Sequence, residues 1–213
     1  MSQQLHSDHR IGRGFAVLRR LLPRKRVNQL YPVLRRLCSY TLAIHDYVEG
    51  TPEAQSIGLM ADERNYVQHC LMSLNVDEDP GETEQEYALY KLCQFSASIY
   101  SLLIVFPLPP TTAPFATLAI LLKKKLSKSG VNAPWDQAPH LMLWITVMGA
   151  ISAIGTSERS WYISMLVRST LRLKMNSWVE MKECLQDFLW FGSTSDVDGA
   201  YLWKEIQVAL LFS

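Results

Sequence analysis

The sequence predicts an all-α protein that forms a single domain. Apolar residues recur at the spacing that places them on one face of an α-helix through most of the chain. No stretch alternates polar and apolar residues as a β-strand does. With 213 residues, 48% of them hydrophobic and 19% charged, the chain has enough apolar surface for one large core. We therefore expect about seven to eight helices in one globular unit.

Helices are expected first at 31–48 and at about 62–74. Pro32 stands where a first helical turn tolerates proline, and Gly50 ends this first helix. Thr83 and Glu86 have the spacing of a capping box, in which two side chains satisfy free backbone donors at a helix start. The helix that begins there must end before Pro107, because proline removes a backbone donor and clashes with the preceding turn. The next helix is expected at about 113–127.

The segment 138–155 is 18 residues long, and His140 is its only ionisable side chain. It fits either a membrane span or a helix that is buried on every side. Its two glycines and its small residues favour the buried core helix. The remaining helices are expected at 157–173, after a second capping box formed by Ser177 and Glu180, and from about Gly199 onward.

Positive charge is concentrated near the N-terminus. Residues 1–36 contain nine Lys and Arg residues and one acid, Asp8, for a local net charge of +8, whereas the whole chain has a net charge of +1. We interpret 1–27 as a basic, flexible arm and 28–213 as the helical domain. Such an arm can bind nucleic acid or an anionic membrane surface, be read by the nuclear import machinery, or simply be solvated. The predicted import signal consists of Arg19, Arg20, Arg24, Lys25 and Arg26.

The sequence contains no recognisable catalytic or metal-binding pattern. The nucleophile motif GxSxG and the phosphate loops GxxxxGK[ST] and GxGxxG are absent. The histidines and cysteines lack the spacing of metal ligands, and we interpret the cysteines as reduced thiols within helices. We therefore expect neither enzymatic activity nor a zinc ion or other cofactor. The residues involved are His6, His9, His45, His69, His140, Cys38, Cys70, Cys93 and Cys184.

All tryptophans lie at or after residue 135, which fits either a ligand pocket or a dense core. The core interpretation is favoured because aromatic side chains dominate burial in cores. The sequence assigns no ligand-binding residue. The tryptophans are Trp135, Trp144, Trp161, Trp178, Trp190 and Trp203.

Several segments follow one another in an order shared with a known family. In the last third of the chain they are LWITVMGA at 143–150, SERSWY at 157–162, SWVEMKECLQDFLW at 177–190 and DGAYLWKE at 198–205. Upstream are GRGF at 12–15, RNYVQHCLMSL at 64–74, and Ile99-Tyr100 before Phe106-Pro107. In order and spacing, these segments resemble the C-terminal regulatory region of fungal zinc-cluster transcription factors, the fungal-specific transcription factor domain. The resemblance covers nearly the whole chain.

The resemblance implies an all-α domain that regulates transcription in the nucleus, with the cytoplasm as the alternative location. It implies action by partner or effector binding and not by catalysis. The implied partners are transcriptional regulators or coregulators, including a homologous regulator. Under this interpretation the chain is a truncated regulator, a degenerate paralogue or a stand-alone modulator. The alternative function is that of a membrane-associated helical protein using the segment 138–155.

One feature of the family is missing from the sequence. Such regulators bind DNA through an N-terminal cluster of six cysteines around two zinc ions, with a repeated CxxCx6C pattern, and this pattern does not occur here. Neither zinc nor direct sequence-specific DNA binding is therefore expected. The basic N-terminal segment would attract phosphates weakly, because charge alone carries no base readout.

Overall fold

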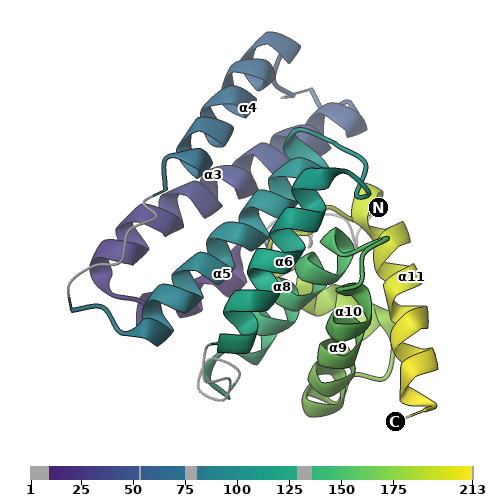
Figure 1. Ribbon diagram of the computed structural model, residues 1–213. Helices are drawn as coiled ribbons and strands as arrows, with labels where there is room; N and C mark the ends of the chain where they lie inside the picture. The colour runs from purple at the N-terminus through teal and green to yellow at the C-terminus, as the bar shows by residue number, and fades with distance from the viewer. Residues whose placement is uncertain (1–9, 53, 75–80, 129–135, 213) are drawn as a thin grey trace.

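The structure is a computed structural model that describes residues 10–52, 54–74, 81–128 and 136–212 (Figure 1). The described residues form nine α-helices and no strand, which confirms the all-α class and slightly exceeds the expected number of helices. In chain order the elements are η1 (Arg13–Val17), α2 (Leu18–Leu21), α3 (Arg24–Glu49), α4 (Ile57–Met72), α5 (Glu84–Tyr100), η2 (Ser101–Val105), α6 (Ala113–Lys128), α8 (Pro139–Ser152), α9 (Arg159–Leu173), α10 (Trp178–Leu185) and α11 (Gly192–Leu210).

Helix α8 lies at the centre of the fold. It contacts α5, α6, α9, α10, α11 and η1, and all of its residues from Leu141 to Ser152 are buried. A helix surrounded in this way needs apolar or small side chains on every face, which explains its composition. The prediction of a buried core helix within 138–155 is confirmed. The helix is shorter than that segment because the chain turns after Ser152, with a positive φ of 75° at Gly155.

A different segment has the length and composition of a membrane span. Among the described residues, this is the continuous helix Glu84–Val105, made of α5 and η2, and 78% of its most apolar window is buried inside the protein. Its partners in the fold include α3, α4, α6 and α8. Core helices that are mostly buried pass the same test of length and apolarity. The α8 helix is 14 residues long, less than the roughly 20 residues that a span requires.

The structure corrects the prediction of a flexible arm at 1–27. Residues 1–9 lie outside the described residues, but from residue 10 onward the chain packs into the domain. Phe15, Leu18 and Leu22 are buried in the core, and α3 begins at Arg24 instead of at 31. These apolar residues recur at helical spacing among the arginines. Their burial therefore determines the structure of this segment, although its composition is basic.

The first capping box is confirmed in full and the second only in part. The Thr83 backbone donates to Glu86 Oε2 at 2.9 Å, and the Glu86 backbone donates to Thr83 Oγ1 at 3.2 Å. At α10, the Glu180 backbone donates to Ser177 Oγ at 3.3 Å. The Glu180 carboxylate, however, accepts from the backbone of Asn176 at 2.6 Å. In a complete capping box it would accept from the backbone of Ser177.

Candidate functional site

The segments that carry the family resemblance contact one another. Trp144 of α8 donates from Nε1 to the carbonyl oxygen of Leu189 at 2.9 Å, and its ring stacks on Phe188 with centroids 5.9 Å apart. The Phe15 ring meets both edge-on, 5.1 Å from Trp144 and 5.3 Å from Phe188. This aromatic cluster holds η1 and the turn after α10 against α8.

Two glycines of these segments permit close contacts that other residues would prevent. A Cβ at Gly14 would lie 2.5 Å from the Phe188 ring, and a Cβ at Gly149 would lie 2.2 Å from the Tyr162 ring. The Gly14 backbone also donates to the carbonyl oxygen of Asp187 at 2.7 Å. The glycines in the matched segments therefore set how closely η1 and α9 approach their neighbours.

The last matched segment, DGAYLWKE, is held by an ion pair and by a close contact between a ring and a glycine. Arg159 at the start of α9 forms a two-bonded pair with Glu205 of α11, with Nε–Oε2 and NH2–Oε1 distances of 3.0 and 2.6 Å. Trp178 packs on Gly199, where a Cβ would lie 2.2 Å from the indole ring. We call η1, α8, α9, α10 and α11 together the α8 framework.

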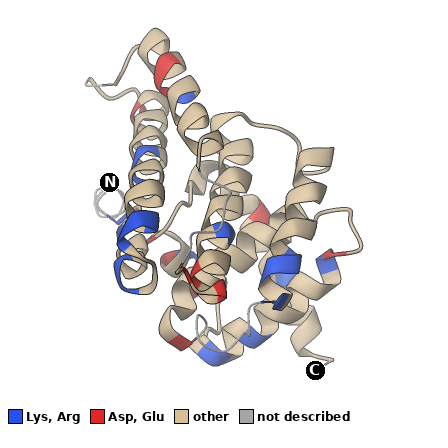
Figure 2. Ribbon diagram, turned by 60° about the vertical axis from the view of Figure 1, so that its left-hand side comes forward, with Lys and Arg blue, Asp and Glu red and all other residues tan. Residues whose placement is uncertain are grey.

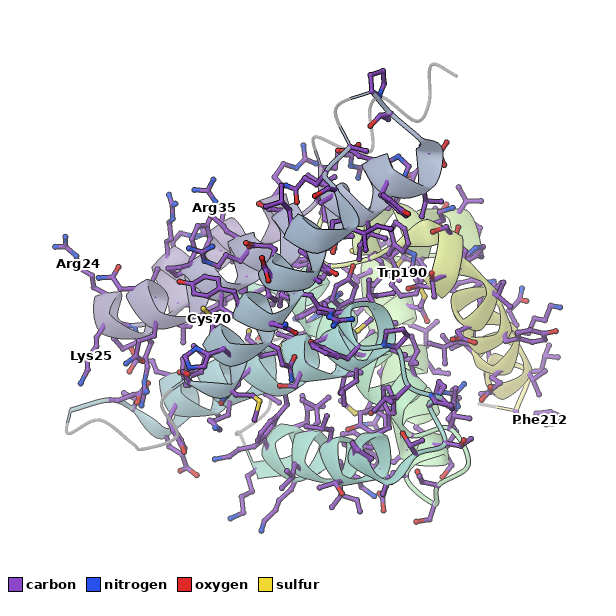
Figure 3. The ribbon with its side chains drawn as sticks, turned by 90° about the horizontal axis from the view of Figure 1, so that it is seen from above. Arg24, Lys25, Arg35, Cys70, Trp190 and Phe212 are labelled. Carbon is purple, nitrogen blue, oxygen red and sulfur yellow. The ribbon has the colours of Figure 1, made fainter. Side chains whose placement is uncertain are left out.

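A cleft of about 750 Å³ lies between the α8 framework and α3. Its volume falls within the range typical of sites for small molecules. Figure 3 shows Trp190 of its lining where the N-terminal helices approach α11. The lining comprises Arg10, Ile11, Thr41, Leu42, His45, Glu49, Trp178, Val179, Lys182, Glu183, Gln186, Trp190, Phe191, Gly192, Ser193 and Asp196.

Aromatic side chains form one wall of the cleft. Trp178 and Trp190 lie 5.9 Å apart between ring centroids at an angle of 61°, and His45 of α3 meets Phe191 edge-on at 6.4 Å. Trp190 is 4% exposed, so its ring is fixed by packing. Trp178 is only half-buried, and its ring is the part of this wall with apolar area left to contact a ring in a ligand.

Both cationic side chains of the cleft, Arg10 and Lys182, are paired. Arg10 donates from Nε to Asp187 Oδ1 at 2.9 Å and from NH2 to the carbonyl oxygen of Glu183 at 2.9 Å. Lys182 donates to Asp196, which also accepts from Trp190 Nε1 at 2.9 Å. These bonds fix the walls of the cleft and leave its cations neutralised.

Two acids of the lining have no such partner. The carboxylates of Glu49 and Glu183 form no ion pair with a described residue, and both side chains are exposed. The rim of the cleft therefore carries excess negative charge. This arrangement suits the binding of a ring-bearing ligand that is neutral or positively charged.

The thiols close to this region are held in the protonated form. Burial raises the pKa of Cys38 to about 12. Burial and the nearby Asp187 carboxylate raise the pKa of Cys184 to about 12. Because the thiolate is the reactive form of cysteine, neither thiol is activated as a nucleophile at neutral pH. Within the described residues, no group of three or more His, Cys, Asp and Glu side chains is placed to hold a metal ion.

The predicted import signal is divided between the surface and the interior. Arg19 and Arg20 of α2 and Arg24 and Lys25 of α3 are exposed. The Arg26 side chain is 1% exposed and its partner Glu82 is 2% exposed, with two donor–acceptor distances of 2.9 and 2.7 Å between them. Arg26 is therefore a structural residue. The role of the other four as an import signal stays a prediction.

Sequence reasoning assigned no ligand site, and the cleft shows why. Its two walls come from residues separated by more than half of the chain, so no local motif marks it. The tryptophans were the available signal, and the core interpretation is correct for Trp144, Trp190 and Trp203, which are buried. Trp178 and Trp190 also line the cleft, whereas Trp135 lies outside the described residues.

Comparison of the chain with family models, with curated proteins and with solved structures gives no significant match. The family resemblance therefore rests on the sequence segments quoted above.

Proposed function

We propose that this chain is a regulatory domain of the fungal zinc-cluster transcription-factor type, which acts in the nucleus by binding an effector or a partner and not by catalysis. The observation that carries the proposal is the way the matched segments fit together. Pairs of contacting residues join the segments GRGF, LWITVMGA, SWVEMKECLQDFLW and DGAYLWKE. Such contacts are expected if the family shares these segments because they build one common fold.

The cleft supplies a place for the effector. The segment SWVEMKECLQDFLW forms the α10 wall, and α3 forms the opposite wall. A ligand bound there would bridge α3 and the segment 178–196. Such a ligand would stabilise their relative positions, since anything that binds only the folded state stabilises it by mass action. The stabilised arrangement would in turn control the binding of transcriptional regulators or coregulators.

A tethered reporter tests the proposal. The full chain is fused to a heterologous DNA-binding domain, and expression from a promoter carrying its sites is compared with that of the DNA-binding domain alone across several nutrient conditions. We expect activation or repression in at least one condition. An inert fusion that is nuclear and stably expressed would contradict the transcriptional role.

The membrane alternative rests on the apolar segment 138–155, and burial of α8 among six other elements favours its role as a core helix. Carbonate extraction separates the two functions. Recovery of the protein in the supernatant would eliminate the membrane alternative, whereas recovery in the pellet would support it.

A further inference from the structure

A second hollow lies on the N-terminal helices, away from the cleft. It has a volume of about 730 Å³ and is lined by Arg19, Arg24, Val27, Asn28, Tyr31 and Pro32. Figure 2 shows Lys and Arg recurring along this part of the ribbon, and Figure 3 shows Arg24, Lys25 and Arg35 projecting outward from α3. We call this hollow the basic groove.

The arginines of the basic groove have no neutralising carboxylate among the described residues. Arg10, Arg13, Arg26 and Arg36 are each paired with an acid, whereas Arg19 and Arg24 are not. Arg19 instead lies over the Tyr31 ring, with Cζ 4.7 Å from the centroid. This contact orients the guanidinium and leaves its donors available to an anion.

The groove also contains the N-terminus of α3, where the charged side chain is basic although acidic side chains are preferred at this end of a helix. Helix N-termini favour acidic side chains and capping residues, because the helix dipole is positive there. Here the cap residue is Pro23, which provides no side-chain cap, and the first turn contains no acid. Arg24 therefore adds positive charge to a positive helix end. Such violations of local preference are expected where a residue serves binding.

The floor of the groove is apolar. Val27 and Tyr31 are half-buried and Pro32 is exposed, and these apolar residues share the lining with Arg19, Arg24 and Asn28. A nucleic acid backbone would use the charges but not this floor. A peptide in which acidic and apolar side chains alternate would use both, since its carboxylates can pair with arginine while its apolar side chains pack between them.

We propose that the basic groove binds a short acidic and apolar segment of a partner protein. Arg19 and Arg24 pair with its carboxylates, and Val27, Tyr31 and Pro32 contact its apolar side chains. This site is separate from the cleft, and the proposal does not depend on the function proposed above.

Fluorescence anisotropy of a labelled synthetic peptide that alternates Asp with Leu and Phe tests the proposal on the full chain. We expect the double variant Arg19→Glu/Arg24→Glu to weaken binding at least tenfold. The matched control Arg168→Glu/Lys204→Glu makes the same change in net charge at exposed positions on α9 and α11, and should change binding less than about twofold. Thermal melts of both variants verify that they are folded.

Two further probes separate the partner classes. A peptide with the apolar residues replaced by serine should lose most of its binding, and single-stranded DNA of equal charge should bind more weakly than the original peptide. Equal binding of all three probes would show a non-specific polyanion surface and overturn the proposal. So would an equal effect of the groove variant and the control variant.

Discussion

Helix α8 at the centre of the framework and helix α4 near the N-terminus use their residues in opposite ways. In α8 every residue from Leu141 to Ser152 is buried, whereas α4 buries only Val67 and Leu71 and exposes Ile57, Leu59 and Met72. Rings and glycines interlock around α8, whereas α4 presents charged and apolar side chains to solvent. The contrast teaches that stability is concentrated in the framework and that recognition is expected at its junction with α3 and on α3 itself.

The largest expected effect tests the aromatic cluster of the framework. Trp144→Ala removes a fully buried indole and its hydrogen bond to Leu189, and should lower the free energy of unfolding by about 3–5 kcal/mol. Tyr66→Ala on α4 removes a half-exposed ring and should cost less than about 1 kcal/mol. Urea unfolding of both variants measures the difference. Equal losses would break the comparison between the two regions.

Arg26 anchors the start of α3 through a buried ion pair with Glu82. Arg26→Ala leaves the Glu82 carboxylate buried without this partner, and should cost about 3 kcal/mol or more. The double variant Arg26→Met/Glu82→Leu should recover most of that loss, because it removes both charges together. Chemical denaturation provides the measurement. If Arg26→Ala were neutral, the pair would not anchor α3.

A pair of glycines gives a smaller effect with opposite signs. Gly149→Ala in α8 places a Cβ 2.2 Å from the Tyr162 ring and should destabilise the protein by about 1–3 kcal/mol. Gly58→Ala in α4 meets no atom within 4 Å, and should be neutral or stabilise by up to about 1 kcal/mol, because alanine loses less entropy in a helix. Thermal melts distinguish the two, and destabilisation by both variants would contradict the comparison.

The smallest effect is a pH dependence at the surface of the framework. The hydrogen bond from Lys123 lowers the pKa of Glu158 below its usual value. The unfolded state therefore binds the proton more readily, so the stabilisation is complete above the usual carboxyl pKa and is lost as the pH falls through the lowered value. Glu158→Gln should be slightly less stable than the wild type near neutral pH, and this difference should shrink on acidification. A difference that is independent of pH would show that the charge of Glu158 is not involved.

Local signals predicted most helices of this fold but missed η1 and α2, and placed the starts of α3 and α11 at 31 and about Gly199 although they lie at Arg24 and Gly192. Thr83 and Pro107 limit the helix between them, because a cap and a proline act only on the backbone of near neighbours. The sequence was therefore sufficient there. The placement of Phe15 against Trp144 could not be inferred, because it joins distant segments. The same holds for the cleft, where Arg10 and Asp187 are separated by 177 positions in the sequence. Basic composition also concealed the burial of Arg26.

The tethered reporter run on two matched variants is the most direct test of the claim that the cleft serves regulation. Val179 lines the cleft and is 62% exposed, whereas Val208 lies outside the lining on α11 and is 56% exposed. Val179→Arg should place a long cationic side chain in the cleft without disturbing the core, and we expect it to change reporter output while Val208→Arg behaves as the wild type. Identical output from all three proteins, or no output from any of them, would contradict this account.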